Sequence, residues 1–90
     1  MTHILKNVVT AVINCEKAAR AKDFTFDEKS YLFWARTELI QKLEKSPDSP
    51  PLIVIESFRD KMLEYYKIHS EPAFGLAYIL ADNVSQELIH

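Results

Sequence analysis

The feature that most constrains the fold is the segment 25–45, which reads TFDEKSYLFWARTELIQKLEK and has the period of one long amphipathic helix. Four apolar residues recur along it at helical spacing and form a single stripe: Leu32, Ala35, Leu39 and Leu43. A helix with one apolar stripe must bury that stripe against other elements. The segment therefore predicts a helical domain with this stripe facing the core.

Two overlapping start signals precede this helix. Thr25 and Glu28 have the spacing of a capping box, in which each side chain satisfies an amide of the first turn. In the competing frame Asp27 is the N-cap, and Phe26 and Tyr31 form a hydrophobic staple. Either frame starts a helix near residue 26, and the Ser-Pro pair after residue 45 ends it.

Three further segments show helical periodicity. In 3–22 the apolar face comprises Ile4, Leu5, Val8, Val12, Cys15 and Ala19. In 51–69 it comprises Ile55, Phe58, Met62, Tyr65, Tyr66 and His69. In 72–89 it comprises Ala73, Ala77, Leu80, Ala81, Val84 and Leu88. The first half of this last segment, AFGLAYILA, is apolar almost all round, so we expect it to be the most buried part of the fold.

The connectors and the small residues predict how the helices pack. Short connections between helices favour antiparallel neighbours. Alanines at intervals of four in the last helix, and small residues with the same spacing in the first, allow these two helices to approach closely. The sequence therefore predicts an all-α fold, an antiparallel up-down four-helix bundle with helices at roughly 3–22, 26–45, 51–69 and 72–89. Residues 1–90 form one domain in this interpretation.

Composition indicates the cellular compartment and makes some classes of partner less favoured. The chain has 90 residues, a net charge of −2 and a single cysteine, Cys15, on an apolar helix face. A lone buried thiol favours a reducing cytoplasm. No basic footprint for nucleic acid is visible. The longest uncharged apolar run, 73–81, is about half of what a bilayer requires, so we expect no transmembrane segment.

Candidate chemical groups are few. Glu87 and His90 have a spacing used in di-iron bundles, but this motif occurs once. His69, on an apolar stripe, is more typical of a hydrogen-bonded core or rim histidine than of a general base. The acidic stripe of Glu56, Asp60 and Glu64 is interspersed with cations, which favours a solvated charged face. We therefore predict no enzyme, no cofactor and no metal site.

Trp34 departs from the core pattern, because it falls on the helix face shared by Glu38, Gln41 and Lys45. One interpretation is that Phe24 or Phe26 folds back and covers it, or that the bundle buries a wide face there, since Trp is usually largely buried. The other is an interface with a second copy or another protein, where Trp and Tyr are enriched. The candidate interface comprises Trp34, Tyr31, Glu38 and Gln41.

These features predict a small bundle that acts through protein contacts as a regulator, an inhibitor or an assembly subunit. A homodimer is one form that this interaction could take. In its length, and in the stretch Ser-Pro-Pro-Leu-Ile at 49–53 that opens the third helix, the chain also resembles the enterocin A-type bacteriocin immunity proteins. That resemblance implies a cytosolic four-helix protein with an immunity function, and it assigns no site residue. A nucleic-acid-binding regulator is the least favoured class, because 51–69 is acidic and the connector before it is rich in proline.

Overall fold

The structure, a computed structural model, describes residues 2–21, 23–45 and 52–89, with side chains from Lys6 onward. Within these ranges the chain forms four helices and no strand. Helix α1 spans Thr2–Ala21, α4 spans Leu52–His69 and α5 spans Pro72–Ile89. The second helix is continuous and comprises α2 (Phe26–Trp34), a π-helical turn η1 (Ala35–Leu39) and α3 (Ile40–Lys45). No helix in these ranges combines the length and the apolar character needed to cross a bilayer.

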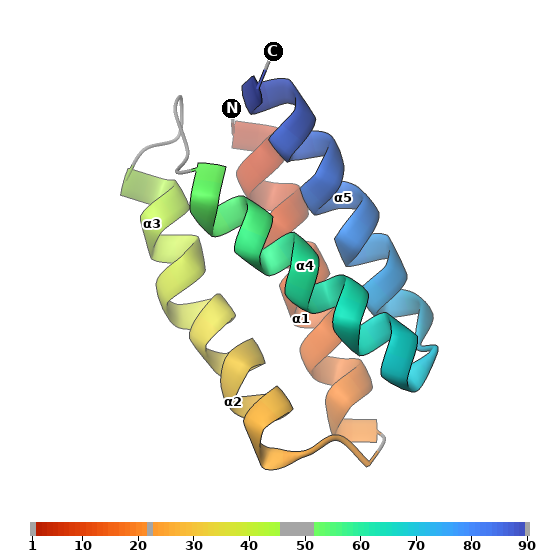
Figure 1. The fold of residues 1–90 in the computed structure, drawn as a ribbon. Helices are drawn as coiled ribbons and strands as arrows, with labels where there is room; N and C mark the ends of the chain where they lie inside the picture. The colour runs from red at the N-terminus through yellow and green to blue at the C-terminus, as the bar shows by residue number, and fades with distance from the viewer. Residues whose placement is uncertain (1, 22, 46–51, 90) are drawn as a thin grey trace.

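The prediction of an all-α four-helix bundle is confirmed. Figure 1 shows the helices running alternately up and down, with the two ends of the chain at the same end of the bundle. Helix α5 packs against both α4 and α1, and α1 packs against the second helix. The predicted contact between the first and last helices is therefore present. The predicted ends at residues 22 and 51, the connector 46–51, and the side chains of Ile4 and Leu5 lie outside the described residues.

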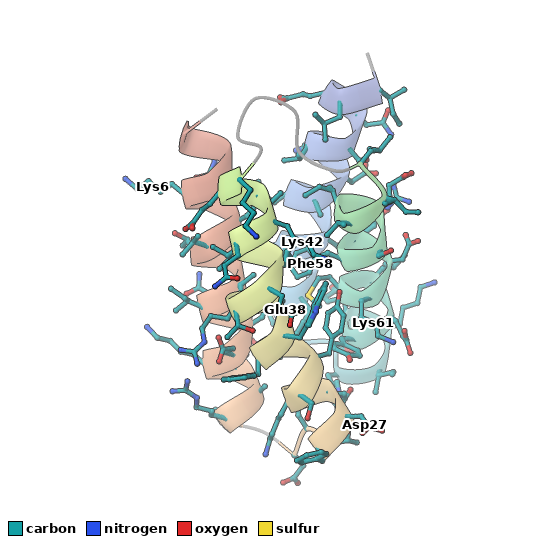
Figure 2. All side chains as sticks on the ribbon, turned by 90° about the vertical axis from the view of Figure 1, so that its left-hand side faces the viewer. Lys6, Asp27, Glu38, Lys42, Phe58 and Lys61 are labelled. Carbon is teal, nitrogen blue, oxygen red and sulfur yellow. The ribbon has the colours of Figure 1, made fainter. Side chains whose placement is uncertain are left out.

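Most of the core comes from the apolar stripes that the helical period predicts, and Phe24 and Phe74 add to it from outside those stripes. The buried hydrophobic residues are Val8, Val12, Cys15, Ala19, Phe24, Leu32, Ala35, Leu39, Leu43, Ile55, Phe58, Met62, Tyr65, Phe74, Ala77, Ala81 and Val84. Phe58 is among the largest fully buried side chains and lies between the helices in Figure 2. A fully buried side chain of this kind stabilises the fold by about 1.5–3 kcal/mol relative to exposure.

The second helix starts in the Thr25 frame. Thr25 accepts a hydrogen bond from the Glu28 amide at 3.1 Å, and the Glu28 carboxylate accepts one from the Thr25 amide at 2.7 Å. The competing frame is wrong, because Phe26 is the first helical residue and its side chain is 82% exposed, so it makes no staple.

The π-helical turn interrupts the second helix and was not predicted. Its wider winding joins the amide of Ile40 to the carbonyl of Ala35, five residues back. The Thr37 hydroxyl donates to the carbonyl of Phe33 at 3.0 Å, which supplies a hydrogen-bond donor beside the altered winding. The stripe from Leu32 to Leu43 fits a regular α-helix equally well, so periodicity alone could not reveal this turn.

The expectation that the first half of α5 is the most buried segment is wrong. Leu76 is 68% exposed and Ile79 is 54% exposed, although Phe74 and Ala77 on the same helix are fully buried. Helix α5 is flanked by α4 and α1, so one side of it faces outward whatever its composition. Tyr66, which was assigned to the core stripe of α4, likewise lies 41% exposed.

A tight turn at the Ser-Glu-Pro sequence of residues 70–72 joins α4 to α5. Ser70 adopts the left-handed conformation, with φ of 54°, and its amide donates to the carbonyl of Tyr66 at 2.7 Å. This arrangement is a common way to end a helix, because it satisfies one of the last carbonyls. Pro72 then begins α5, where its missing amide costs nothing.

Cys15 lies at the centre of the packed helices and is fully buried. Its Sγ atom is 3.9 Å from Sδ of Met62 and 3.6 Å from the carbonyl oxygen of Ala73. Burial, together with the negative charge of Glu71, raises the pKa of the thiol to about 12. The thiolate is the reactive form, so both access and ionisation oppose modification.

Labelling with a thiol reagent tests this placement of Cys15. We expect slow reaction in native buffer and rapid reaction in denaturant, because labelling requires unfolding. The matched control is Ser30→Cys in a Cys15→Ala background, which moves the only thiol to an exposed position on α2 and should react quickly in both conditions. Fast labelling of native Cys15 would show that the side of α1 assigned to the core is open.

Candidate functional site

The described residues contain no group of three or more His, Cys, Asp or Glu side chains arranged to hold a metal ion. Glu87 is exposed near the end of α5, while His90 and the side chain of His3 lie outside the described residues. The acidic stripe on α4 forms ion pairs with neighbouring cations: Arg59 with Asp60 at 3.0 Å and Glu56 at 3.9 Å, and Lys61 with Glu64 at 3.5 Å. The predicted solvated charged face is confirmed.

Arg59 also reaches from α4 to α5. Its guanidinium donates to the hydroxyl of Ser85 at 3.3 Å and lies 3.5 Å from the carboxylate of Asp82. Ser85 is fully buried and donates to the carbonyl of Asp82 at 3.0 Å, so its hydroxyl is satisfied on both sides. Hydrogen bonding to Asp60 is the main reason that the pKa of Arg59 is raised, despite some desolvation. This cluster joins α4 to α5 through ion pairs and hydrogen bonds.

A second polar cluster links the end of α4 to the start of the second helix. His69, the last residue of α4, lies with Nε2 at 2.6 Å from the Glu28 carboxylate. Phe24 stacks on the imidazole with ring centroids 3.8 Å apart, and it also stacks on Phe74 at 5.2 Å. The prediction of a hydrogen-bonded His69 at the rim of the core is confirmed. Its partner was missed, because sequence spacing assigned Glu28 only to the helix cap.

The environment of Glu28 determines its ionisation. Desolvation raises the pKa of this carboxyl, but hydrogen bonds from the Thr25 amide, from His69 and from the Thr25 hydroxyl outweigh it, and the pKa is lowered. The carboxylate form is therefore favoured. A catalytic acid needs the opposite shift, since it must hold a proton near neutral pH.

The predicted interface around Trp34 has a definite geometry. The indole is partly buried, its N–H donates to the Glu38 carboxylate at 2.6 Å, and Lys42 Nζ lies 5.9 Å from the ring centroid. Figure 2 looks onto this helix and labels Glu38 and Lys42. Gln41 is exposed. Cover by Phe24 or Phe26 is wrong, because Phe24 stacks on His69 and Phe26 points into solvent. The bundle itself buries part of this face, since the partly buried Trp34 packs against the core.

Tyr31 fills the space between the second helix and α4. Its ring centroid lies 5.4 Å from that of Trp34 and 6.1 Å from that of Tyr65, whose ring it meets edge-on. Lys61 Nζ lies 5.8 Å from the centroids of both tyrosine rings. Its hydroxyl is buried and has no hydrogen-bond partner among the described residues. Burial raises the pKa of Tyr31, so the hydroxyl stays protonated. Of the four residues predicted to form the interface, Tyr31 therefore contributes mainly to packing.

An exposed apolar surface lies on the outer side of α5, where Leu76 is 68% exposed and Ile79 is 54% exposed. Tyr66, Pro72, Gly75, Leu76 and Ile79 line one shallow groove of about 270 Å³ there, and we call these residues the α5 outer face. Gly75 makes this possible, because a Cβ at this position would lie 3.1 Å from the Tyr66 ring. Sequence reasoning missed this surface by assigning the segment to the core.

A larger groove of about 450 Å³ adjoins the α5 outer face and runs between α5 and α1. Its lining is mainly apolar, from Ala11, Ala73, Leu76, Ala77 and Leu80, and Asn7, Thr10 and Asn14 add amide and hydroxyl groups. Leu76 borders both grooves. The two grooves therefore meet at Leu76, and the residues that line them are uncharged.

Comparison of the chain with protein-family models, with curated proteins and with solved structures found no match in any of the three. The candidate sites are accordingly defined by geometry.

Replacing Glu28 by Gln tests the buried pair. A carboxyl whose pKa is lowered on folding adds stability above its unfolded pKa and loses it as the pH falls through the folded value. We expect Glu28→Gln to lower the free energy of unfolding by about 1–3 kcal/mol at neutral pH, the range for hydrogen bonds to charged groups. The deficit should shrink below the ordinary pKa of 4.5, where the wild type loses the same contribution.

Thermal and denaturant unfolding at several pH values measures this effect. The control is Glu44→Gln, which changes an exposed glutamate of the same helix that has no ion pair among the described residues. If Glu28→Gln and the wild type lose stability in parallel through the acid range, the pair with His69 does not stabilise the fold.

Proposed function

We propose that this protein acts by binding another protein through the α5 outer face, as a regulator, an inhibitor or an assembly subunit, and not by catalysis. The observation that carries the proposal is the exposure of Leu76 and Ile79 on a helix with no charged residue between Pro72 and Ala81. Exposed apolar area is unfavourable by roughly 25 cal/mol per Å², so a partner that covers this face gains that energy.

The composition of the surface supports the proposal. Protein interfaces have an apolar centre depleted of charge and a polar rim. Here Leu76 and Ile79 form the centre, and the amides of Asn7 and Asn14 and the hydroxyl of Thr10 line the groove beside them. A nucleic acid would require cations on this surface, and none lines either groove. Protein is therefore the class of partner that we propose.

The compartment that we propose is the cytoplasm, on the basis of the free buried thiol of Cys15. The face around Trp34, Tyr31, Glu38 and Gln41 remains the second candidate for contact with a partner or with a second copy. It ranks lower because the Trp34 N–H is already bonded to Glu38 and the indole is partly buried.

Site-specific photo-crosslinking tests the α5 outer face. A photoreactive residue at Leu76 should trap a partner in native cytoplasm, and the purified partner should then lose at least tenfold in affinity for Leu76→Glu, because the variant places a charge in the apolar centre. Asn83→Glu is the matched control, since it adds the same charge at an exposed position further along α5. Sedimentation of the purified chain shows whether the partner is a second copy.

Trp34→Lys completes this comparison. Binding that survives Leu76→Glu and is lost in Trp34→Lys would move the interface to the second helix and contradict the proposal. Circular dichroism of each variant establishes that the fold is retained.

We propose bacteriocin immunity as the alternative function. The resemblance to the bacteriocin immunity proteins implies a four-helix fold, and this chain has four helices among its described residues. An immunity protein would protect a bacteriocin-sensitive strain that expresses it. The measurement is growth of such a strain, with and without the chain, in the presence of enterocin-type bacteriocins. We expect no protection if the protein functions only as proposed above.

A further inference from the structure

A small pocket lies between α1 and the second helix, on the side of the bundle away from the α5 outer face. It has a volume of about 190 Å³ and is lined by Glu16, Ala19, Arg20, Lys29, Leu32 and Phe33. Ala19 and Leu32 are buried, so they form an apolar floor, and Phe33 is 56% exposed and forms a wall. The second helix and α5 lie on different sides of α1 in Figure 1.

Cations surround this pocket. Arg20 and Lys29 line it directly, and Arg36 stacks over the Phe33 ring with its guanidinium carbon 5.4 Å from the centroid. One carboxylate, that of Glu16, pairs with two of these cations, Arg20 and Arg36. The pocket is therefore locally positive in a chain whose net charge is −2.

The ion pairs of Glu16 leave donors unused. Glu16 lies 3.7 Å from Nη2 of Arg20 and 3.2 Å from Nε of Arg36, and its side chain is only 13% exposed. A guanidinium has five N–H donors, so each arginine keeps donors for another acceptor while Glu16 holds it in place. Lys29 is exposed and has no ion pair among the described residues. The Arg20 guanidinium and the Lys29 ammonium thus border the apolar floor, and the Arg36 guanidinium lies over the ring of the Phe33 wall.

The size of the pocket indicates what it can hold. Sites that enclose a small-molecule ligand have volumes of about 300–1,000 Å³, and this pocket is smaller than that range. It has room for one apolar side chain of a larger partner. The cations at its edge would then meet acidic groups next to that side chain in the partner's sequence.

We infer that this pocket binds an acidic segment of a protein, with one apolar side chain on Ala19, Leu32 and Phe33 and adjacent carboxylates on Lys29, Arg20 and Arg36. The inference is independent of the function proposed for α5. Charge complementarity also orients the partner on the protein. The rest of the protein surface is negative and repels an acidic segment, whereas the cations around this pocket attract it.

Fluorescence anisotropy with a labelled peptide of alternating glutamate and leucine tests the inference. We expect saturable binding that weakens as salt is added, because the attraction is between charges. Two control peptides isolate the contributions: one replaces glutamate by lysine and the other replaces leucine by serine, and both should bind at least tenfold more weakly. A DNA oligonucleotide of equal charge serves as a probe for general polyanion binding.

The decisive variant is Lys29→Glu, since Lys29 has no structural ion pair to lose among the described residues. It should weaken binding of the glutamate-leucine peptide at least tenfold, and Phe33→Ser should do the same through the apolar contact. Lys67→Glu, at an exposed position on α4, is the matched control and should leave affinity unchanged.

Three results would overturn the inference. These are absence of peptide binding at millimolar concentration, equal weakening by Lys29→Glu and Lys67→Glu, and tighter binding of the oligonucleotide than of the peptide. Because none of these residues belongs to the α5 outer face, failure here leaves the function proposed for α5 unaffected.

Discussion

The arrangement of the helices depends most on the two hydrogen bonds of the Glu28 carboxylate, one to Thr25 and one to His69. One of its oxygens accepts the Thr25 amide and so closes the capping box that starts the second helix. The other lies 2.6 Å from His69, where α4 ends. Phe24, just before the cap, stacks on the same imidazole and on Phe74 of α5. A single side chain therefore connects the start of one helix to the end of another and, through Phe24, to the third.

This connection is needed because the second helix and α4 do not approach each other closely through their backbones. Large side chains occupy the space, chiefly Tyr31 and Tyr65, whose rings meet edge-on. Such a pair adds about 0.5–1.5 kcal/mol beyond its buried area. The aromatic contact alone would thus hold this side of the bundle weakly, and the Glu28–His69 pair strengthens it.

Local signals in the sequence were sufficient for the helices and the core. Thr25 and Glu28 are three residues apart, and Leu32 to Leu43 repeat at a fixed period, so both could be predicted without knowing the partners of the helix. The pairing of Glu28 with His69 joins residues 41 positions apart, and no local pattern encodes it. Leu76 and Phe74 have similar hydrophobicity, and only the positions of α1 and α4 decide that one is exposed and the other buried.

The same reasoning explains why the pocket between α1 and the second helix was not predicted. Glu16 and Arg20 lie one turn apart on α1, but only the register of the two helices brings Arg36 to them. Arg36 belongs to the π-helical turn, whose wider winding alters the direction of its side chains relative to a regular helix. Such turns occur frequently at functional sites, where the irregular winding costs stability but positions a side chain. Thr37, in this turn, reduces that cost by donating a hydrogen bond to the carbonyl of Phe33. Phe33 also forms the wall of the pocket, so the same residue contacts both the irregular turn and the pocket.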